Sequence, residues 1–455
     1  MTAASEPGST TAAAAPVALD TAKLVADRLG LDFPARRSAD LERGLARAAR
    51  AEGYRSVADY VGWLRGQPTE STGWHRLAGE LTVGESYFFR DSAVHEALER
   101  RVLPGLIAER REAGVLRLRV WSAGCSTGEE PYSLAMLLDR LLPDRERWQL
   151  TILGSDIDPQ ALAAARRGIY RQWALRELPG WARRHFTRHG AERYELAAGI
   201  REMVTLAPLN LVSTGYPSAV TGTGAMDLIL CRNVLMYLTR PAQRATVERL
   251  QRSLVAGGWL VVGPAEGSTE LLQPLAPVLF PDAILRRKPT AGAIDVRTGA
   301  PLPSPRAPRA ADGPAQPSRG QADTQPTPLQ RARAEADRGG LERASELCRA
   351  ALEQDRLDPE AHLLLAAIHR ERGENAAALE AARAAIYAAP DHAPAHFLLG
   401  SVLLQQGSTQ LGRQSMETAT TLLSSLPPDQ PLAQGDGLTA GVLLATARAH
   451  LALVS

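Results

Sequence analysis

The chain of 455 residues has few cysteines, little net charge and no long apolar run. Its three cysteines, Cys125, Cys231 and Cys348, are too widely spaced for a disulfide framework or a zinc site, so we expect no metal. The formal charge of +2 gives no reason to expect binding to nucleic acid or to an anionic membrane surface. No apolar stretch approaches the ~20 residues that cross a bilayer, so we expect no membrane insertion.

We also expect no targeting segment at the N-terminal end. Residues 1–16 have neither the basic start nor the long apolar core of a signal peptide, so we expect a disordered tail on a cytoplasmic protein. A chain of this length usually holds about three domains. The first is predicted over residues 17–80 as a small helical domain, in which Ser38 and Ser56 are the N-caps of two helices.

The most informative stretch is Val120–Ser133, which reads V-W-S-A-G-C-S-T-G-E-E-P-Y-S. It follows Val115–Val120, which alternates with the period of a strand, and it runs into an apolar-periodic helix, Tyr132–Leu142. Strand, glycine turn and helix bring the backbone close to a nucleotide-like ligand. Because Gly124 and Gly128 are spaced Gly-x-x-x-Gly and no Gly-Lys-Ser/Thr follows, a phosphate is not the expected ligand. A tight turn that binds nothing is the alternative.

A second buried strand, Gln149–Ser155, ends in the two acids Asp156 and Asp158. An ionised carboxylate at the tip of the second strand can accept hydrogen bonds from both hydroxyls of a ribose, as in Rossmann-like folds. The alternative for either acid alone is the N-cap of the alanine-rich helix Pro159–Gly168. Two acids at this distance from Gly124 favour a cofactor site.

Further strands are predicted at Met226–Cys231 and Gly258–Gly263, which gives a mostly parallel sheet with helices on both faces. This α/β Rossmann-like arrangement is the usual setting for S-adenosylmethionine (SAM) chemistry. The alternation of strands and helices breaks at about residues 184–208. There, Tyr194–Leu196 and Met203–Leu206 flank a turn and predict a small antiparallel β insertion.

The C-terminal third changes composition and then repeats. Prolines punctuate residues 289–328, which predicts a flexible linker. In residues 329–455, Gly339, Gly373 and Gly407 stand 34 residues apart, and several alanines keep the same period. This period is typical of the paired helices of tetratricopeptide (TPR) repeats, a helical solenoid, whereas a plain alanine-rich bundle is the alternative. On such a linker, the module is expected to bind an unidentified protein partner without touching the active site.

Five motifs, in this order, resemble those of the CheR-family methyltransferases, which esterify glutamates on chemotaxis receptors. The resemblance covers roughly Leu19 to Lys288. The motifs are Leu81–Arg90 (L-T-V-G-E-S-Y-F-F-R), Ser122–Ser133, Ser155–Asp158, Ala207–Leu211 (A-P-L-N-L) and Cys231–Tyr237 (C-R-N-V-L-M-Y). The resemblance implies an N-terminal all-α domain, a SAM-dependent methyltransferase domain over residues 81–288 and a β-subdomain within it. Whether that subdomain docks a receptor tail is left open, because the segment is short and lacks a glycine cluster.

The resemblance also implies roles for residues at the reacting end of the site. Arg90 and Tyr237 are expected beside the transferred methyl group, where the tyrosine hydroxyl orients the incoming carboxylate. Asp156 is expected to hold the ribose hydroxyls, and Glu130 to lie near the methionine amino group. Arg90 needs a charged or polar partner if it is buried.

The remaining implied contacts belong mainly to the adenine end. Asn210 and Leu211 match adenine-side positions, and Arg232 with Asn233 is expected beside them. The family often has Asn where Gly84 stands, so a side-chain hydrogen bond is lost there. The full set of implied cofactor-binding residues is Gly84, Ser86, Arg90, Gly124, Glu130, Asp156, Asn210, Leu211, Arg232 and Asn233.

Three arginines in the N-terminal domain suggest an acceptor surface. Arg43, Arg47 and Arg50 fall at i, i+4 and i+7, on one face of a helix. In the family this helix is basic and faces the acidic, helical methylation region of receptors. The resemblance therefore implies that these arginines bind the cytoplasmic helical region of a chemoreceptor, and a solvated charged face is the alternative.

Methylation of a carboxylate needs few protein groups. A glutamate, with an ordinary pKa of ~4.3, is ionised at neutral pH and requires no general base. The Asn/Asp-Pro-Pro-Tyr tetrapeptide typical of methylation of amino groups on bases is absent, which counts against a DNA adenine methyltransferase. We expect a protein-glutamate O-methyltransferase of signal transduction. The second hypothesis is a TPR interaction or scaffold protein with a vestigial SAM-binding domain.

Overall fold

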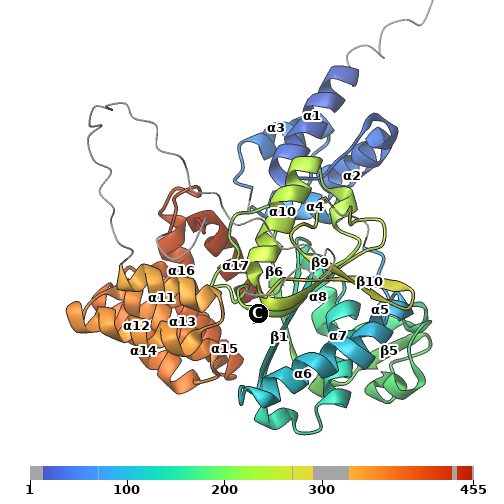
Figure 1. Cartoon of the computed structure of the whole chain (residues 1–455). Coiled ribbons are helices and arrows are strands. Elements are labelled where there is room, and N and C mark those ends of the chain that lie inside the picture. The colour runs from blue at the N-terminus through green and yellow to red at the C-terminus, as the bar shows by residue number, and fades with distance from the viewer. Residues whose placement is uncertain are drawn as a thin grey trace, which may run out of the picture.

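The computed structural model describes residues 14–69, 71–82, 84–268, 270–290, 327–432 and 438–452. Residues 1–13 of the expected tail and residues 291–326 of the expected linker lie outside these ranges. Figure 1 shows N-terminal helices in blue, a central sheet with its helices in cyan to yellow, and C-terminal helices in orange and red. Within the described ranges, no helix is both long enough and apolar enough to cross a bilayer.

The N-terminal domain consists of α1 (Ala14–Leu29), α2 (Ser38–Ala51), α3 (Val57–Arg65) and α4 (Thr72–Leu81). The Ser56 side chain accepts a hydrogen bond from the N–H of Asp59 at 3.1 Å, which confirms the predicted cap of α3. The predicted cap at Ser38 is wrong, because a 3₁₀ turn over Ala35–Arg37 brings Ser38 into α2 as its first residue. Side chains of these helices share one apolar cluster with the sheet.

Seven strands form the central sheet in the order β6-β2-β1-β7-β8-β10-β9. The pairs among β6, β2, β1, β7 and β8 are parallel, whereas β10 runs antiparallel to both β8 and β9. The strands are β1 Arg117–Ala123, β2 Gln149–Asp156, β6 Val204–Pro208, β7 Met226–Cys231, β8 Leu254–Val262, β9 Ala276–Phe280 and β10 Ala283–Arg287. The predicted mostly parallel sheet is confirmed. Its strand order reverses between β1 and β7, where sheets of this kind bind ligands at the carboxyl ends of the strands.

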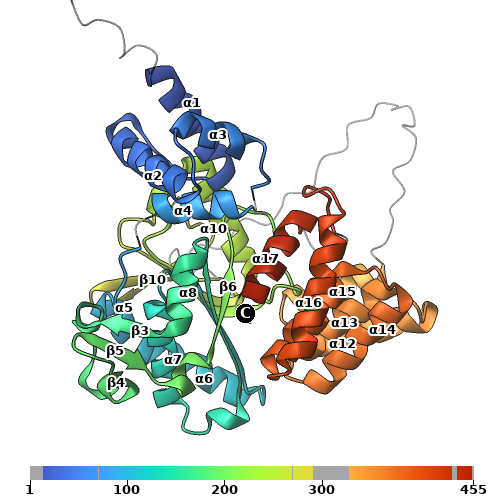
Figure 2. The ribbon, with the colours of Figure 1, turned by 180° about the vertical axis from the view of Figure 1, so that it is seen from behind.

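Helices cover both faces of this sheet, as Figures 1 and 2 show. They are α5 Ser92–Ala97, α6 Leu103–Glu112, α7 Glu129–Leu141, α8 Pro159–Arg167 and α10 Arg240–Ser253. On one face, α6, α7 and α8 pack around Leu118 and Val120 of β1. On the other, α10 and the N-terminal domain pack around Trp121 of the same strand. Because successive side chains of a strand point to opposite faces, β1 contributes to both cores.

The β insertion is confirmed, but its predicted pairing and bounds are wrong. It is a three-stranded antiparallel sheet in the order β3-β5-β4, with β3 Ile169–Arg171, β4 Phe186–Arg188 and β5 Arg193–Leu196. Met203–Leu206 does not pair with Tyr194–Leu196, because Val204 begins β6 and runs parallel to β2 in the main sheet. The short helix α9 (Ala198–Arg201) separates the two strands and redirects the chain.

The C-terminal helices form three pairs and one further helix. They are α11 (Pro328–Asp337) with α12 (Leu341–Gln354), α13 (Pro359–Glu371) with α14 (Asn375–Ala388), α15 (Ala393–Gln405) with α16 (Thr409–Ser424), and α17 (Ala440–Ala452). Gly339, Gly373 and Gly407 have φ angles of +83°, +72° and +76°, and each lies between the two helices of a pair. The 34-residue period therefore marks left-handed turns, which glycine adopts at little cost, and the expected TPR-like pairing is confirmed.

These TPR-like helices pack against the sheet domain. The Arg370 guanidinium of α13 donates to the carbonyl oxygens of Ala219 at 2.6 Å and Val220 at 3.1 Å, in the loop before β7. Arg119 of β1 forms an ion pair with Glu371 of the same helix. Val220 is 3% exposed within an apolar cluster of the C-terminal helices. The module is therefore packed on the sheet domain and not held by its linker alone, while residues 327–432 and 438–452 contribute nothing to the cavities described below.

An uncovered part of the sheet explains this contact. Residues 209–225, between β6 and β7, form turns and bends without a helix, where a doubly wound sheet ordinarily carries one. Helices α15 and α17 lie over this place. Phe397 and His450 line a cavity of about 690 Å³ there, together with Thr151 and Leu153 of β2. The C-terminal helices thus complete the cover of the sheet.

Candidate active site

The first turn of the site follows β1. Gly124 and Gly128 have φ angles of +84° and +90°, in the left-handed region that favours glycine. A Cβ on Gly124 would collide with Val234 in the turn after β7, and one on Gly128 would lie 2.8 Å from Ala165 of α8. Glycine at position 124 is therefore needed where two turns of the site meet. Its contact with a cofactor stays a prediction.

Asp156 ends β2, beside this turn. Its Oδ2 accepts a hydrogen bond from the N–H of Ser126 at 2.7 Å, and its Oδ1 accepts one from Asp158 at 2.9 Å. Burial raises the pKa of the Asp156 carboxyl, and these hydrogen bonds oppose that shift. Asp158 instead caps α8, because its side chain accepts from the N–H of Gln160 at 2.8 Å. The cap alternative applies to Asp158, while each Asp156 oxygen keeps capacity for a second donor.

Two cavities lie at these strand ends, and the larger, of about 180 Å³, has mostly apolar walls. Leu29 and Leu31, in and just after α1, form part of its wall, so the N-terminal domain helps to enclose it. The Asn210 side chain accepts from the N–H of Val212 at 3.0 Å, which orders the turn after β6. Residues predicted for the cofactor or the reacting end that line this cavity are Gly84, Gly124, Asp156, Asn210, Leu211, Asn233 and Tyr237.

The smaller cavity, of about 100 Å³, is more polar. Gly124, Asn233 and Tyr237 line both cavities, so the two adjoin around these residues. The predicted residues in the smaller lining are Ser86, Arg90, Gly124, Glu130, Arg232, Asn233 and Tyr237. Every residue predicted to bind the cofactor therefore lines one cavity or the other.

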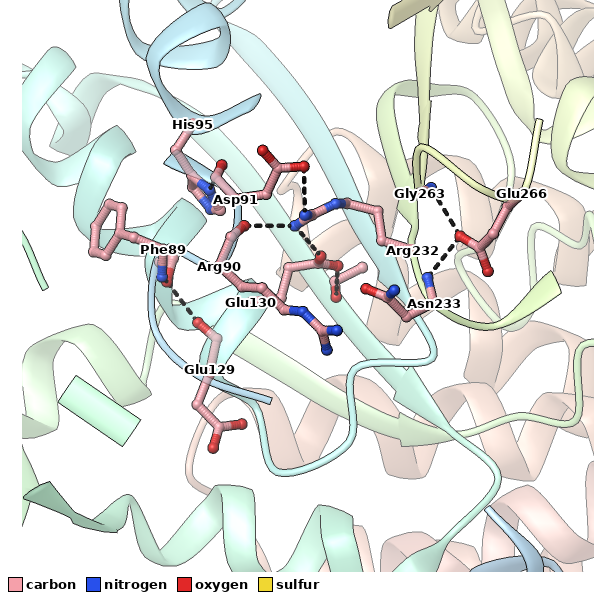
Figure 3. A network of polar contacts seen from close by, with 12 residues as sticks. Phe89, Arg90, Asp91, His95, Glu129, Glu130, Arg232, Asn233, Gly263 and Glu266 are labelled. Atoms are coloured by element: carbon pink, nitrogen blue, oxygen red, sulfur yellow. Dashed lines mark hydrogen bonds and ion pairs between the residues drawn. The ribbon is translucent and has the colours of Figure 1, made fainter. Parts of the chain in front are cut away.

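Arg232 is the centre of a charged network in the smaller cavity (Figure 3). Its side chain is 3% exposed and pairs with Asp91 at 3.2 Å and Glu130 at 3.3 Å. Its Nη1 also donates to the carbonyl oxygen of Arg90 at 2.9 Å. The other Glu130 oxygen accepts from the Ser122 hydroxyl at 2.7 Å. The network supplies the partners that a buried guanidinium needs.

This network corrects one prediction. Arg232 and Asn233 were both expected beside the adenine-side residues Asn210 and Leu211. Asn233 does line the larger cavity with them, but Arg232 lines only the smaller one. The reason is electrostatic, because the carboxylates that neutralise a buried arginine lie at the polar end of the site.

Arg90 and Tyr237 reach the smaller cavity from two sides. The Arg90 guanidinium donates to the carbonyl oxygen of Glu85 at 2.7 Å. The carbonyl oxygen of Tyr237 accepts from the N–H of Asp32 at 2.7 Å, and the Arg37 guanidinium lies 5.6 Å from the centre of its ring. The N-terminal domain therefore holds Tyr237 in place. The part that the two side chains play in methyl transfer stays a prediction.

Two residues of the site were missed at the level of sequence. His95 of α5 lines the smaller cavity and is 4% exposed, and burial together with Arg232 lowers its pKa to about 4, so its imidazole is neutral. No pattern distinguished it from a core residue. Glu266, after β8, accepts hydrogen bonds from the turn that carries Asn233. Its signal was an acid just beyond a buried strand, the same signal that identified Asp156.

Other reactive side chains near the site are structural. Glu129 accepts a hydrogen bond from the Thr127 hydroxyl at 2.7 Å, and burial raises its pKa. Burial also raises the pKa of the Cys125 and Cys231 thiols, so both remain protonated small apolar groups. Among the residues that the structure describes, no cluster of His, Cys, Asp or Glu forms a metal site.

The arginines of α2 lie on an exposed face outside both cavities. Arg43 pairs with Asp40 at 2.5 Å, and Arg47 pairs with Glu80 at 2.6 Å. Their side chains are still 64% and 53% exposed, and Arg50 is exposed as well. The predicted common face is confirmed. Its contact with an acceptor protein stays a prediction.

The donor set of the two cavities fits SAM. The larger cavity offers apolar walls for a planar base and the Asp156 carboxylate for a pair of hydroxyls. The smaller cavity offers the Glu130 carboxylate for an ammonium group, and Arg232 for a carboxylate. An adenosine joined to a zwitterionic amino acid matches this division.

Comparisons with known proteins agree with this fit. The family profile "CheR methyltransferase, SAM binding domain" matches residues 84–274, and "CheR methyltransferase, all-alpha domain" matches residues 21–82. The chain is 36% identical over 196 residues to "Chemotaxis protein methyltransferase 1" of Pseudomonas aeruginosa, covering 42% of this chain and 69% of that protein. It is 33% identical over 219 residues to "Chemotaxis protein methyltransferase 2" of Vibrio cholerae, covering 48% and 74%. It is 32% identical over 272 residues to "Probable biofilm formation methyltransferase WspC" of Pseudomonas aeruginosa, covering 58% and 60%.

Proposed function

Because the chain belongs to the CheR methyltransferase family, which binds SAM, we propose that it methylates glutamate side chains of chemoreceptor proteins. The product is a glutamate methyl ester, and the activity is that of a protein-glutamate O-methyltransferase. Relatives named as chemotaxis protein methyltransferases support the class of acceptor. The observation that carries the proposal is the pair of adjoining cavities, one apolar with Asp156 and one polar with Glu130.

The chemistry asks little of the protein beyond binding and placement. When bound, SAM supplies a methyl group on a positively charged sulfur. A glutamate acceptor is already ionised at neutral pH, since its ordinary pKa is ~4.3, so no side chain has to remove a proton. The protein contributes by holding the acceptor carboxylate in line and by excluding water. Arg90 attracts the carboxylate, and the Tyr237 hydroxyl donates a hydrogen bond that orients it.

The exposed arginine face of α2 supports the acceptor side of the proposal. Arg43, Arg47 and Arg50 lie on the N-terminal domain, whose Leu29 and Leu31 enclose the larger cavity. An acidic helical segment of a receptor bound on this face would lie on the same domain that encloses the cofactor site. Such a charged contact acts mainly on association and specificity.

The direct test is methyl transfer from labelled SAM to candidate receptor cytoplasmic fragments. We expect label in the fragment, and none when the acceptor glutamates are replaced by glutamine. Arg90→Ala and Tyr237→Phe should each slow the transfer while SAM is saturating and the fold is intact, because both residues are placed at the acceptor. Transfer at the parent rate in both variants would remove these two residues from the reacting end.

The second hypothesis, a TPR interaction protein with a vestigial SAM-binding domain, predicts a different result. It requires SAM binding to be absent or transfer to be undetectable with every acceptor fragment. The complete set of predicted residues around the cavities favours the enzyme instead. A SAM titration followed by the transfer assay separates the two hypotheses.

A further inference from the structure

Glu266 occupies an unusual place beside the site. It lies just beyond β8, is 7% exposed, and faces the turn that follows β7 (Figure 3). Its Oε2 accepts hydrogen bonds from the N–H groups of Asn233 at 2.6 Å and Gly263 at 2.7 Å. Its Oε1 accepts one from the N–H of Met236 at 3.3 Å. One buried carboxylate thus holds three backbone amides through charge-assisted hydrogen bonds.

The turn held in this way shapes both cavities. Asn233 and Tyr237 line the two of them, and Val234 lines the larger. Asn233 has a φ angle of +59°, a left-handed conformation that a residue other than glycine keeps only where its surroundings hold it. Val234 is also the side chain that leaves no room for a Cβ on Gly124. A shift of this turn therefore moves the walls of the cofactor site and the glycine turn after β1 together.

The backbone at the end of β8 packs closely on the Glu266 carboxylate. A Cβ on Gly263 would lie 2.5 Å from its Oε2, so the strand end is shaped around this oxygen. The carboxylate itself is absent from the lining of both cavities. Any effect of Glu266 on the cofactor must therefore pass through the turn of Asn233 to Tyr237.

We propose that Glu266 is a positioning residue, which fixes the turn after β7 so that Asn233 and Tyr237 face the cofactor. The inference rests on the cofactor site of the proposed function and not on its acceptor. It assigns to the end of β8 a part in the site alongside the ends of β1, β2 and β7.

The test is Glu266→Gln, a nearly isosteric change. The glutamine amide keeps one acceptor oxygen but turns its NH₂ group toward a backbone N–H, so at least one hydrogen bond is lost and two donors meet. We expect SAM affinity, measured by calorimetry, to fall about tenfold, since hydrogen bonds to charged groups are among the strongest that folding makes. Hydrogen exchange should become faster at the amides of Asn233 and Met236 and remain unchanged in α10. Glu266→Asp, which keeps the charge on a shorter arm, should recover part of the affinity.

Two controls separate positioning from general stability. Glu270→Gln changes an exposed acid on the same segment and should leave SAM affinity unchanged. Val247→Ala removes apolar contacts of α10, where the parent side chain is 1% exposed, and should lower thermal stability without changing SAM affinity. The inference is overturned if Glu266→Gln binds SAM like the parent. It is also overturned if Glu266→Gln loses no more SAM affinity than Val247→Ala. A parent that binds SAM but methylates no carboxylate would contradict the proposed function, while the titration would still decide on Glu266.

Discussion

The two ends of the same parallel strands serve different purposes. At the carboxyl ends of β1 and β2, glycine turns and acids line the cofactor cavities, whereas near their starts Arg119 and Gln149 contact the TPR-like helices. In the cavity, Arg232 is neutralised by the carboxylates of two side chains. At the interface, Arg119 pairs with the Glu371 carboxylate, and Arg370 donates to two backbone carbonyls of one loop.

The cavities are hollows that a ligand can enter, whereas the interface joins two parts of the same chain. Side-chain carboxylates can change partner when a charged ligand arrives, but backbone carbonyls move only if their loop moves. Burial lowers the pKa of Arg119 to about 9 and that of Arg370 to about 10, so both remain charged at neutral pH and keep their partners. The TPR-like helices therefore keep charged contacts with the sheet domain, and the chemistry that we propose belongs to the cavities.

The largest expected effect is at the cavity end. Asp156→Ala removes the acceptor of two hydroxyl hydrogen bonds, each worth roughly 1.5–3 kcal/mol, and should weaken SAM binding at least tenfold. Asp139→Ala on α7, which removes an ion pair with Arg145 away from both cavities, is the matched control and should bind SAM normally. If calorimetry shows unchanged SAM affinity in a folded Asp156→Ala protein, Asp156 does not bind the cofactor.

Acid should weaken both ends, through one histidine at each whose pKa is lowered. Burial lowers the pKa of His95 at the cavity and of His450 at the interface to about 4, from an ordinary value of 6.5. The neutral form is favoured in the fold, so this stability is complete above pH 6.5 and is lost as the pH falls from 6.5 toward 4. The free energy of unfolding should fall by about 2 kcal/mol for each histidine between pH 7.5 and pH 5, because one unit of pKa corresponds to ~1.4 kcal/mol. Chemical denaturation of His95→Gln and of His450→Gln should each show a flatter pH dependence than the parent, and equal slopes would contradict these shifts.

Removal of the TPR-like helices tests whether the interface is separate from the site. A chain ending near Pro289 should still fold, bind SAM and methylate isolated receptor fragments at a similar rate, because the helices contribute no lining to either cavity. It should melt roughly 5 °C lower, since Val220 and the starts of the strands lose their cover. Arg370→Ala in the full chain should lower the melting temperature by less. Loss of SAM binding on truncation would make the TPR-like helices part of the catalytic unit.

The smallest effect is expected outside both regions. Reversal of Arg43, Arg47 and Arg50 to glutamate should raise the KM for a receptor fragment several-fold and blunt its salt dependence, because exposed charges steer association. SAM affinity should stay the same. If the receptor kinetics equal those of the parent, the arginines of α2 form only a solvated charged face.

The residues that line the two cavities could be predicted because most of their motifs lie at the end of a predicted strand. Asp156 and Gly124 need only their own strand and turn to be recognised, and parallel pairing brings the strand ends together. The neighbours of Arg232 could not be predicted, because Asp91 and Glu130 come from distant segments that only the fold brings together. Glu266 carried the same local signal as Asp156, but nothing in the sequence tied it to the turn of Asn233.

The arrangement of the domains was less predictable than the domains themselves. The 34-residue period gives the helical pairs, but the period says nothing about which surface they cover. That surface exists because residues 209–225 form no helix, and its contacts depend on Arg370 meeting the backbone of a loop far away in the sequence. The predicted partner strand of β5 was wrong for a similar reason, since α9 was too short to be recognised as a break between two strands.

The central claim is that the methyl group passes to a carboxylate, and alkali tests it most directly. A receptor fragment labelled from SAM by the full chain should release its label as methanol in mild alkali, because a methyl ester is hydrolysed there and an N-methyl group is not. We predict complete release of the label as methanol, and less label to release from a fragment incubated with the Asp156→Ala protein at limiting SAM. Label that survives alkali would contradict methylation of glutamate.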